Sequence, residues 1–137
     1  MMRKMLIAIG VLASLATPGW AQNVEQAPPP APYKKVSTLV KLPDFLPGLG
    51  TLYVDPSTLP AGPFLAYDHK DKLVSTIYMI PMKDMSGEKT FADLPAPGGK
   101  VDHVSLHFNA GHPGVPEPHY HIVLWHVSRQ QESLVQK

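Results

Sequence analysis

Sixteen prolines are spread along the 137 residues, and they limit the length of any helix that this chain can form. A proline inside a helix removes a backbone hydrogen bond and clashes with the preceding turn. Between the prolines lie short runs that are rich in β-branched and aromatic residues. These runs cover residues 36–42, 50–55, 63–68, 72–82, 100–109 and 119–128. Short strands with turn signals about every ten residues predict an all-β, antiparallel sandwich or barrel in a single domain.

The first 21 residues have the features of a secretory signal peptide. Arg3 and Lys4 form a basic start, residues 5–16 are apolar, and Ala21 precedes the predicted cleavage site. A dozen apolar residues fall short of the roughly 20 that span a bilayer, so we expect cleavage rather than membrane insertion. We therefore expect a periplasmic protein, with an extracellular location as the alternative. After cleavage, we expect a proline-rich, poorly ordered leader at residues 22–35, a β domain at 36–129 and a tail at 130–137.

The charge of the mature chain excludes an electrostatic nucleic-acid binder. Removing residues 1–21 takes away two basic side chains, which leaves ten basic against eleven acidic ones. A formal charge of about −1 without a basic patch offers no footprint for nucleic acid. The chain has no cysteine, so a disulfide framework is excluded.

Histidines dominate the C-terminal third of the chain. Six of the seven lie within 24 residues, namely His103, His107, His112, His119, His121 and His126. Neutral imidazole is the commonest protein ligand for transition metals. Side chains alternate along a strand, so His103 and His107 share one face, as do His119 and His121. The cluster therefore predicts a metal site between two strands.

The other face of the first histidine strand carries Val104, Leu106 and Phe108. We expect this apolar face to pack on the core and the histidine face to line a polar site. Antiparallel pairing in one register places His107 opposite His119 and Ser105 opposite His121. The loop between the strands would bring His112 to the same point.

The predicted metal ligands are His103, His107, His112, His119 and His121. A nitrogen-rich set favours a zinc or copper ion over calcium or magnesium. His126 alternates with apolar residues and is interpreted as packed, and Glu117 is interpreted as a partner that orients an imidazole. Methionines at 79, 82 and 85 suggest a Cu(I) site, but a spacing of three puts neighbours on opposite strand faces, so core packing is favoured.

The loop and the last strand resemble an uncharacterised family of exported bacterial β-proteins, a domain of unknown function. The matching residues are His103, then Gly111-His112-Pro113, then Pro118-His119-Tyr120-His121. This resemblance implies a β fold and a site at His103, His112 and His119, where His121 replaces a family aspartate. The His119-x-His121 pair after Gly114 also resembles the first cupin motif, although residues 122–129 contain no acid.

Two classes of function follow. The first is an exported metal-binding protein that binds, delivers or buffers zinc or copper. The second is a non-catalytic structural or homo-oligomeric envelope protein whose histidines pack or respond to pH. A third reading, a small metal-dependent cupin-like enzyme, requires a substrate cavity beside the histidines. No nucleophile motif supports an enzyme, so binding is favoured over catalysis.

Overall fold

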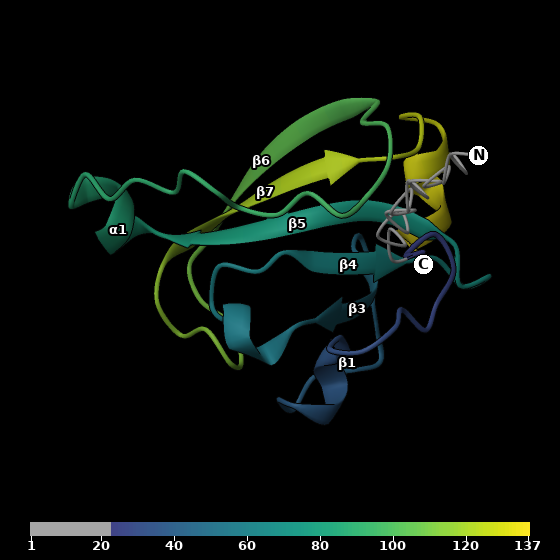
Figure 1. The fold of residues 1–137 in the computed structure, drawn as a ribbon, viewed down its shortest axis with the longest axis horizontal. Coiled ribbons are helices and arrows are strands. Elements are labelled where there is room, and N and C mark those ends of the chain that lie inside the picture. The colour runs from purple at the N-terminus through teal and green to yellow at the C-terminus, as the bar shows by residue number, and fades with distance from the viewer. Residues whose placement is uncertain (1–22) are drawn as a thin grey trace, which may run out of the picture.

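The computed structural model describes residues 23–137, which form an antiparallel sheet of seven strands (Figure 1). The strands are β1 (Lys34–Lys35), β2 (Phe45–Leu46), β3 (Gly50–Val54), β4 (Phe64–Tyr67), β5 (Leu73–Pro81), β6 (His103–Asn109) and β7 (His119–Trp125). Their order is β1-β3-β4-β5-β7-β6, and β2 pairs with β3. The helical elements are η1 (Val36–Thr38), η2 (Pro56–Thr58), α1 (Met82–Ser86) and η3 (Gln131–Val135).

The predicted all-β, single-domain, antiparallel class is confirmed. The sheet is open rather than closed into a barrel, which is consistent with the sandwich alternative. Within residues 23–137, no helix has the length and apolar character needed to cross a membrane. The predicted signal peptide and its cleavage site after Ala21 lie outside the described residues.

The inner face of the sheet carries the main core. Residues of β7 alternate between buried and half-buried, and Val123 and Trp125 are among the buried ones. They join a cluster that also contains Val36, Val115 and Val135, which come from η1, the β6–β7 loop and η3. These segments therefore cover the inner face, and the predicted tail at residues 130–137 contributes Val135 to the core.

Residues 36–42 do not form the predicted strand. They begin with η1 and continue as a turn, in which the Val40 N–H donates to the Val36 carbonyl at 3.0 Å. Residues four apart lie on the same side of a helical turn. Val36 and Val40 therefore both point at the cavity under the sheet, which they line. A strand would also place Val36 and Val40 on one face. The alternation in the sequence therefore could not distinguish a strand from a helical turn.

Residues 23–35 pack on the outer face of the sheet, where a poorly ordered leader was expected. Val24 is buried in a cluster with Leu65 and Tyr67 of β4. The Tyr67 hydroxyl donates to the Val24 carbonyl at 2.8 Å, and the Leu73 N–H donates to the Glu25 carbonyl at 2.9 Å. The prolines keep the segment extended. It packs on the sheet because it buries the apolar outer face of β4.

The apolar side of β6 faces outward, so the predicted orientation of this strand is wrong. Residues paired across two strands share a face, and β6 is paired only to β7. Because Val123 and Trp125 of β7 point into the core, the histidine side of β6 also faces inward. Val104, Leu106 and Phe108 are exposed to 49%, 59% and 57%. The neighbouring strand, not the polarity of β6 itself, decides which side of this edge strand faces the core.

The predicted register of β6 and β7 is wrong by two residues. His107 lies opposite His121, and Asn109 lies opposite His119. The β6–β7 loop is tightened by two hydrogen bonds between His112 and Val115, each of 3.0 Å, so pairing extends closer to the loop. Because side chains alternate with a period of two, this shift does not change which side chains of β6 and β7 share a face.

Candidate metal centre

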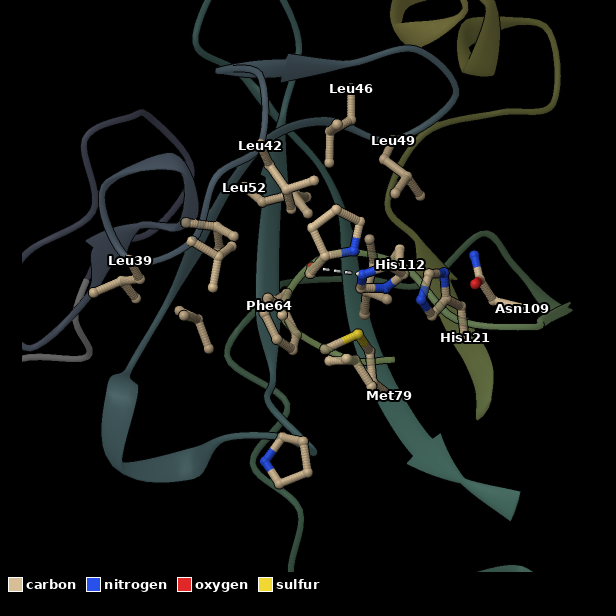
Figure 2. Close-up of a pocket in the computed structure, with 18 of the residues that line it drawn as sticks. Leu39, Leu42, Leu46, Leu49, Leu52, Phe64, Met79, Asn109, His112 and His121 are labelled. Atoms are coloured by element: carbon tan, nitrogen blue, oxygen red, sulfur yellow. Dashed lines mark hydrogen bonds between the residues drawn. The ribbon is translucent and has the colours of Figure 1, made fainter. Parts of the chain in front are cut away.

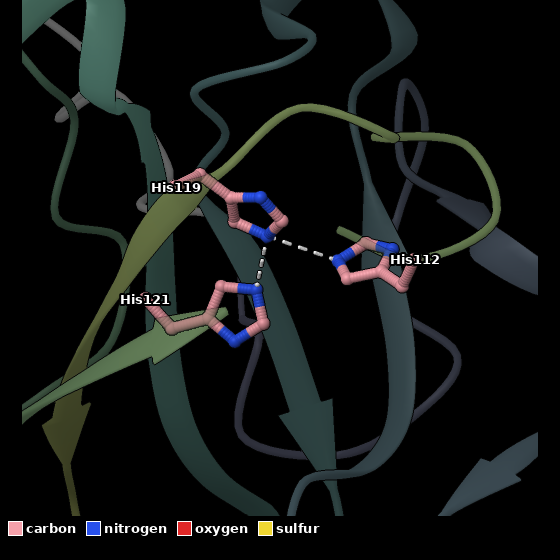
Figure 3. A group of neighbouring side chains, drawn as sticks. All are labelled: His112, His119 and His121. Atoms are coloured by element: carbon pink, nitrogen blue, oxygen red, sulfur yellow. Dashed lines mark hydrogen bonds between the residues drawn. The ribbon is translucent and has the colours of Figure 1, made fainter. Parts of the chain in front are cut away.

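Three histidines meet at the end of β7 next to the β6–β7 loop (Figure 3). His119 and His121 are two residues apart on β7 and therefore project from the same face. His112 approaches from the loop. Gly111 has a φ of +134°, and a Cβ there would lie 2.4 Å from the Pro116 carbonyl oxygen. Only glycine permits the sharp return of the chain that presents His112.

The distances in this group suit one metal ion. The His119 Nε2 atom lies 2.9 Å from the His121 Nε2 and 3.1 Å from the His112 Nε2. The three potential ligand atoms all lie within 4.8 Å of one another. In tetrahedral zinc sites, bonds of roughly 2.0–2.1 Å place neighbouring nitrogens about 3.3 Å apart. Small movements of the rings would bring the three Nε2 atoms to this spacing and supply three of the four ligands.

Hydrogen bonds on the far side of two rings fix their tautomers. The His119 Nδ1 lies 2.7 Å from the Glu117 carbonyl, and the His112 Nδ1 lies 3.0 Å from the Pro113 carbonyl. A carbonyl oxygen can only accept, so each Nδ1 carries the proton and donates. In a neutral ring this leaves a lone pair on Nε2. With this tautomer on both rings, the Nε2 lone pairs of His119 and His112 lie 3.1 Å apart, an arrangement that one shared cation would stabilise.

Burial favours the uncharged form of the His121 ring. His119 is fully buried and His121 is 8% exposed. Burial, and then the neighbouring His119, His112 and His107, lower the pKa of His121 to about 4. At neutral pH this imidazole is therefore uncharged, which is the form that binds metals. The chemistry of the group is that of a preformed nitrogen site.

Glu117 acts through its backbone rather than its side chain. Its carbonyl orients His119, whereas its carboxylate forms an exposed ion pair with Lys83 at 3.4 Å. The prediction named the right residue, Glu117, but His119 donates to its backbone carbonyl and not to its carboxylate. Backbone hydrogen bonds of this kind commonly hold metal-binding histidines in one tautomer.

His107 lies beside the group but outside it. It is paired with His121 across the strands, at a usual Cβ separation of about 5 Å. Its exposed ring lies 3.0 Å, Nε2 to Oγ, from Ser105. Among the remaining predicted ligands, His107 is the one that lies next to the three-histidine group.

His103 lies at the opposite end of β6 from the three histidines. It is paired with Trp125, six residues from the Asn109–His119 pair, which is roughly 20 Å along a strand. Its Nδ1 lies 2.8 Å from Asp102, its Nε2 bonds Glu132 of η3, and its ring stacks on Trp125. Hydrogen bonds to Glu132 and Asp102 raise the pKa of His103. The structure therefore does not bring His103 together with the other histidines.

His126 is packed, as the sequence indicated. Its ring lies 2.8 Å from the Thr76 hydroxyl and 3.0 Å from the Lys100 carbonyl. Asn109, which the sequence patterns did not single out, lies beside His112 and His121 on the wall of a cavity. The alternation of His103, Ser105, His107 and Asn109 along β6 was the signal that could have identified it.

Two of the three histidines, His112 and His121, line an apolar cavity of about 320 Å³ (Figure 2). His112 and His121 lie together on one side of it, and leucines of residues 39–52 lie across from them. Met79 and Phe64 of the sheet form another part of the wall. Met79 is therefore a buried lining residue, in agreement with its interpretation as core.

Fold and site together define a class of protein: an open antiparallel β-sheet with a group of three histidines, two buried and one half-buried, beside an apolar cavity. A family model for TTHB210-like proteins, described as "Hypothetical protein TTHB210", matches residues 68–108. The solved structure of hypothetical protein TTHB210 from Thermus thermophilus is 48% identical, covers 69% of this chain and 93% of that one, and has a TM-score of 0.63. The chain belongs to the TTHB210-like family.

These comparisons confirm membership of an uncharacterised family, as the resemblance implied. Both the family and the solved structure are described as those of a hypothetical protein, with no activity named. The family model ends before His112, so it does not bear on the loop and strand motifs that carried the resemblance. No curated protein matches the chain.

Proposed function

We propose that this is an exported metal-binding protein in which His112, His119 and His121 hold one zinc or copper(II) ion. The observation that carries the proposal is the convergence of three histidine nitrogens, in which the His119 Nε2 lies within 3.1 Å of the Nε2 atoms of both His112 and His121. The basic and apolar start of the sequence supports export to the periplasm. The proposed role is binding, delivery or buffering of the metal.

The donor set supports a borderline transition metal. Three imidazole nitrogens suit zinc and copper(II), whereas calcium and magnesium require oxygen ligands. Three protein ligands leave a fourth position of a tetrahedral zinc ion for water, for another ligand or for His107. This proposal is narrower than the five-histidine expectation, because His103 is engaged by acidic groups at the far end of β6.

Elemental analysis by mass spectrometry tests the proposal. We expect residues 22–137, purified without a histidine tag, to retain close to one zinc or copper ion per chain. The His119→Ala/His121→Ala variant is expected to retain none, because both replaced rings border the shared point between the Nε2 atoms. Circular dichroism would establish that the variant is folded.

A matched control is His69→Ala, which removes a histidine from the turn between β4 and β5. Its ring stacks on Phe45 and lies outside the group, so metal content is expected to stay unchanged. A wild-type protein that is metal-free, and that also takes up neither zinc nor copper on titration, would refute the proposal.

A second candidate function is homo-oligomeric assembly through β6. This strand lies at one end of the sheet order, so one row of its backbone groups has no strand partner among the described residues. Its sequence HVSLHFN contains no proline, lysine or acid of the kind that protects edge strands, and its apolar face is exposed. A second copy could extend the sheet antiparallel along β6.

Light scattering after size exclusion tests this assembly. If β6 mediates it, wild-type protein at micromolar concentration is expected to be oligomeric and Leu106→Lys monomeric, because the added charge would be buried at the contact. Met85→Lys on α1, a position that is also about half exposed, is the control and is expected to leave the mass unchanged. A monomeric wild type would exclude this function.

A further inference from the structure

We propose that the cavity beside the three histidines binds an amphiphilic ligand, namely an alkyl chain that carries one anionic, metal-coordinating end such as a carboxylate. This inference rests on the proposed metal site and names the class of molecule that the site would bind.

The lining of the cavity specifies the apolar part of the ligand. Its walls come from η1 and the turn after it, from β3, β4 and β5, and from the β6–β7 loop. Among the described residues that line it, Asn109, His112 and His121 are the polar ones, and the others are aliphatic, aromatic, Met, Pro or Gly. Such a wall removes the surface of an alkyl chain from water, and it offers few hydrogen-bond partners to a ligand that is polar along its length.

The position of the histidines specifies where the polar end lies. His112 and His121 both line the cavity and both belong to the three-histidine group, so the proposed ion would lie at one end of the apolar space (Figure 2). Zinc with three histidine ligands has a further position for an oxygen ligand, and carboxylate oxygens bind zinc at roughly 2.0–2.2 Å. A ligand in this orientation would reach the ion with one end and fill the apolar space with the other.

The absence of cationic side chains makes the metal necessary for an anionic ligand. No lysine or arginine is among the described residues that line the cavity. A carboxylate placed against apolar walls without a cation would lose its hydration without compensation. The affinity for the carboxylate is therefore expected to depend on the ion.

The volume limits the length of the chain. A cavity of about 320 Å³ equals the volume of roughly ten waters at about 30 Å³ each, hence of roughly ten non-hydrogen atoms. Octanoate has this size and serves as the probe. Butanoate keeps the same end group but buries four methylenes fewer, and octanol keeps the chain but has no anionic group.

Isothermal titration calorimetry on zinc-loaded and metal-free protein tests the inference. We expect octanoate to bind the zinc-loaded form, butanoate to bind about 100-fold more weakly, and octanol to bind at least about 10-fold more weakly, as one lost coordination bond implies. Octanoate is expected not to bind the metal-free form. The Leu42→Trp variant, which fills the cavity, is expected to keep zinc and to lose octanoate. The control is Leu134→Trp, whose position does not line the cavity.

The outcomes separate this inference from the metal proposal. Zinc-loaded protein that fails to bind octanoate would overturn the ligand inference and leave the metal site intact. Equal binding of octanoate to metal-free protein would contradict coordination of its carboxylate to the ion. Binding that survives Leu42→Trp would contradict the placement of its alkyl chain in the cavity. Failure of the wild type to load zinc or copper would refute the proposed function, and this inference with it.

Discussion

Replacing His119 by alanine is expected to weaken zinc binding by more than about 100-fold. Loss of a group that merely orients a ligand typically costs 10–100-fold in metal affinity, and His119 is proposed as a ligand itself. Its Nε2 is the central atom of the group, since it lies within 3.1 Å of both other Nε2 atoms.

A competition titration against a chelator of known affinity measures this loss, and thermal unfolding provides a second measurement. Zinc at 100 times its Kd stabilises the native state by about 2.7 kcal/mol through mass action. We expect wild-type protein to gain this stability and His119→Ala to gain less than about 0.4 kcal/mol under the same conditions, since its Kd would be at least equal to the zinc concentration. Chelation should return the wild-type protein to its metal-free melting temperature.

His103→Gln is the matched control for the zinc titration. This histidine also lies on the inner side of a β strand, but it bonds Asp102 and Glu132 far from the proposed site. Its replacement is expected to leave the zinc Kd unchanged. If His103→Gln weakened zinc binding as much as His119→Ala, the three-histidine site would be the wrong assignment.

Replacing Val135 by aspartate is expected to lower the free energy of unfolding by about 4 kcal/mol or more. Val135 is fully buried in the main core although it lies close to the C-terminus. A carboxylate at this position would lose its hydration among apolar side chains. Val135→Ala is expected to cost about 2 kcal/mol, from the lost apolar burial and the small cavity that remains. Urea denaturation followed by tryptophan fluorescence measures both.

Leu134→Ala provides the control for Val135. This neighbour in η3 is 40% exposed, so its truncation is expected to change stability by less than about 0.5 kcal/mol. Equal effects of the two alanine variants would show that η3 does not contribute to the core. Stabilities of domains are typically about 5–15 kcal/mol, so Val135→Asp is expected to leave a marginal protein.

Local sequence patterns were sufficient to predict five of the strands and the relative placement of some of the histidines. The runs at residues 50–55, 63–68, 72–82, 100–109 and 119–128 contain β3, β4, β5, β6 and β7. Strand alternation also placed His119 and His121 on one face, because two residues on one strand keep their relation in any fold that contains the strand. The loop composition placed His112 near them.

Patterns within one strand could not decide which face of β6 points to the core. The apolar side chains of β6 were predicted to be inside, but the pairing with β7 turns His103 and His107 inward instead. Single-sequence periodicity also could not exclude His103, because its partner Glu132 lies 29 residues away in η3. Likewise, the cover that residues 23–35 give to Leu65 and Tyr67 depends on a contact between distant segments.

The sequence by itself determined the all-β class, most of the strands and the shared face of His119 and His121. These properties depend on proline spacing, β-branched runs and the two-residue period of a strand, all of which are local. Only the tertiary structure decided the orientation of β6, the separation of His103 from the other histidines, and the apolar cavity beside His112 and His121. These properties depend on which distant segments pack together, since burial is the property of a whole fold and not of a strand.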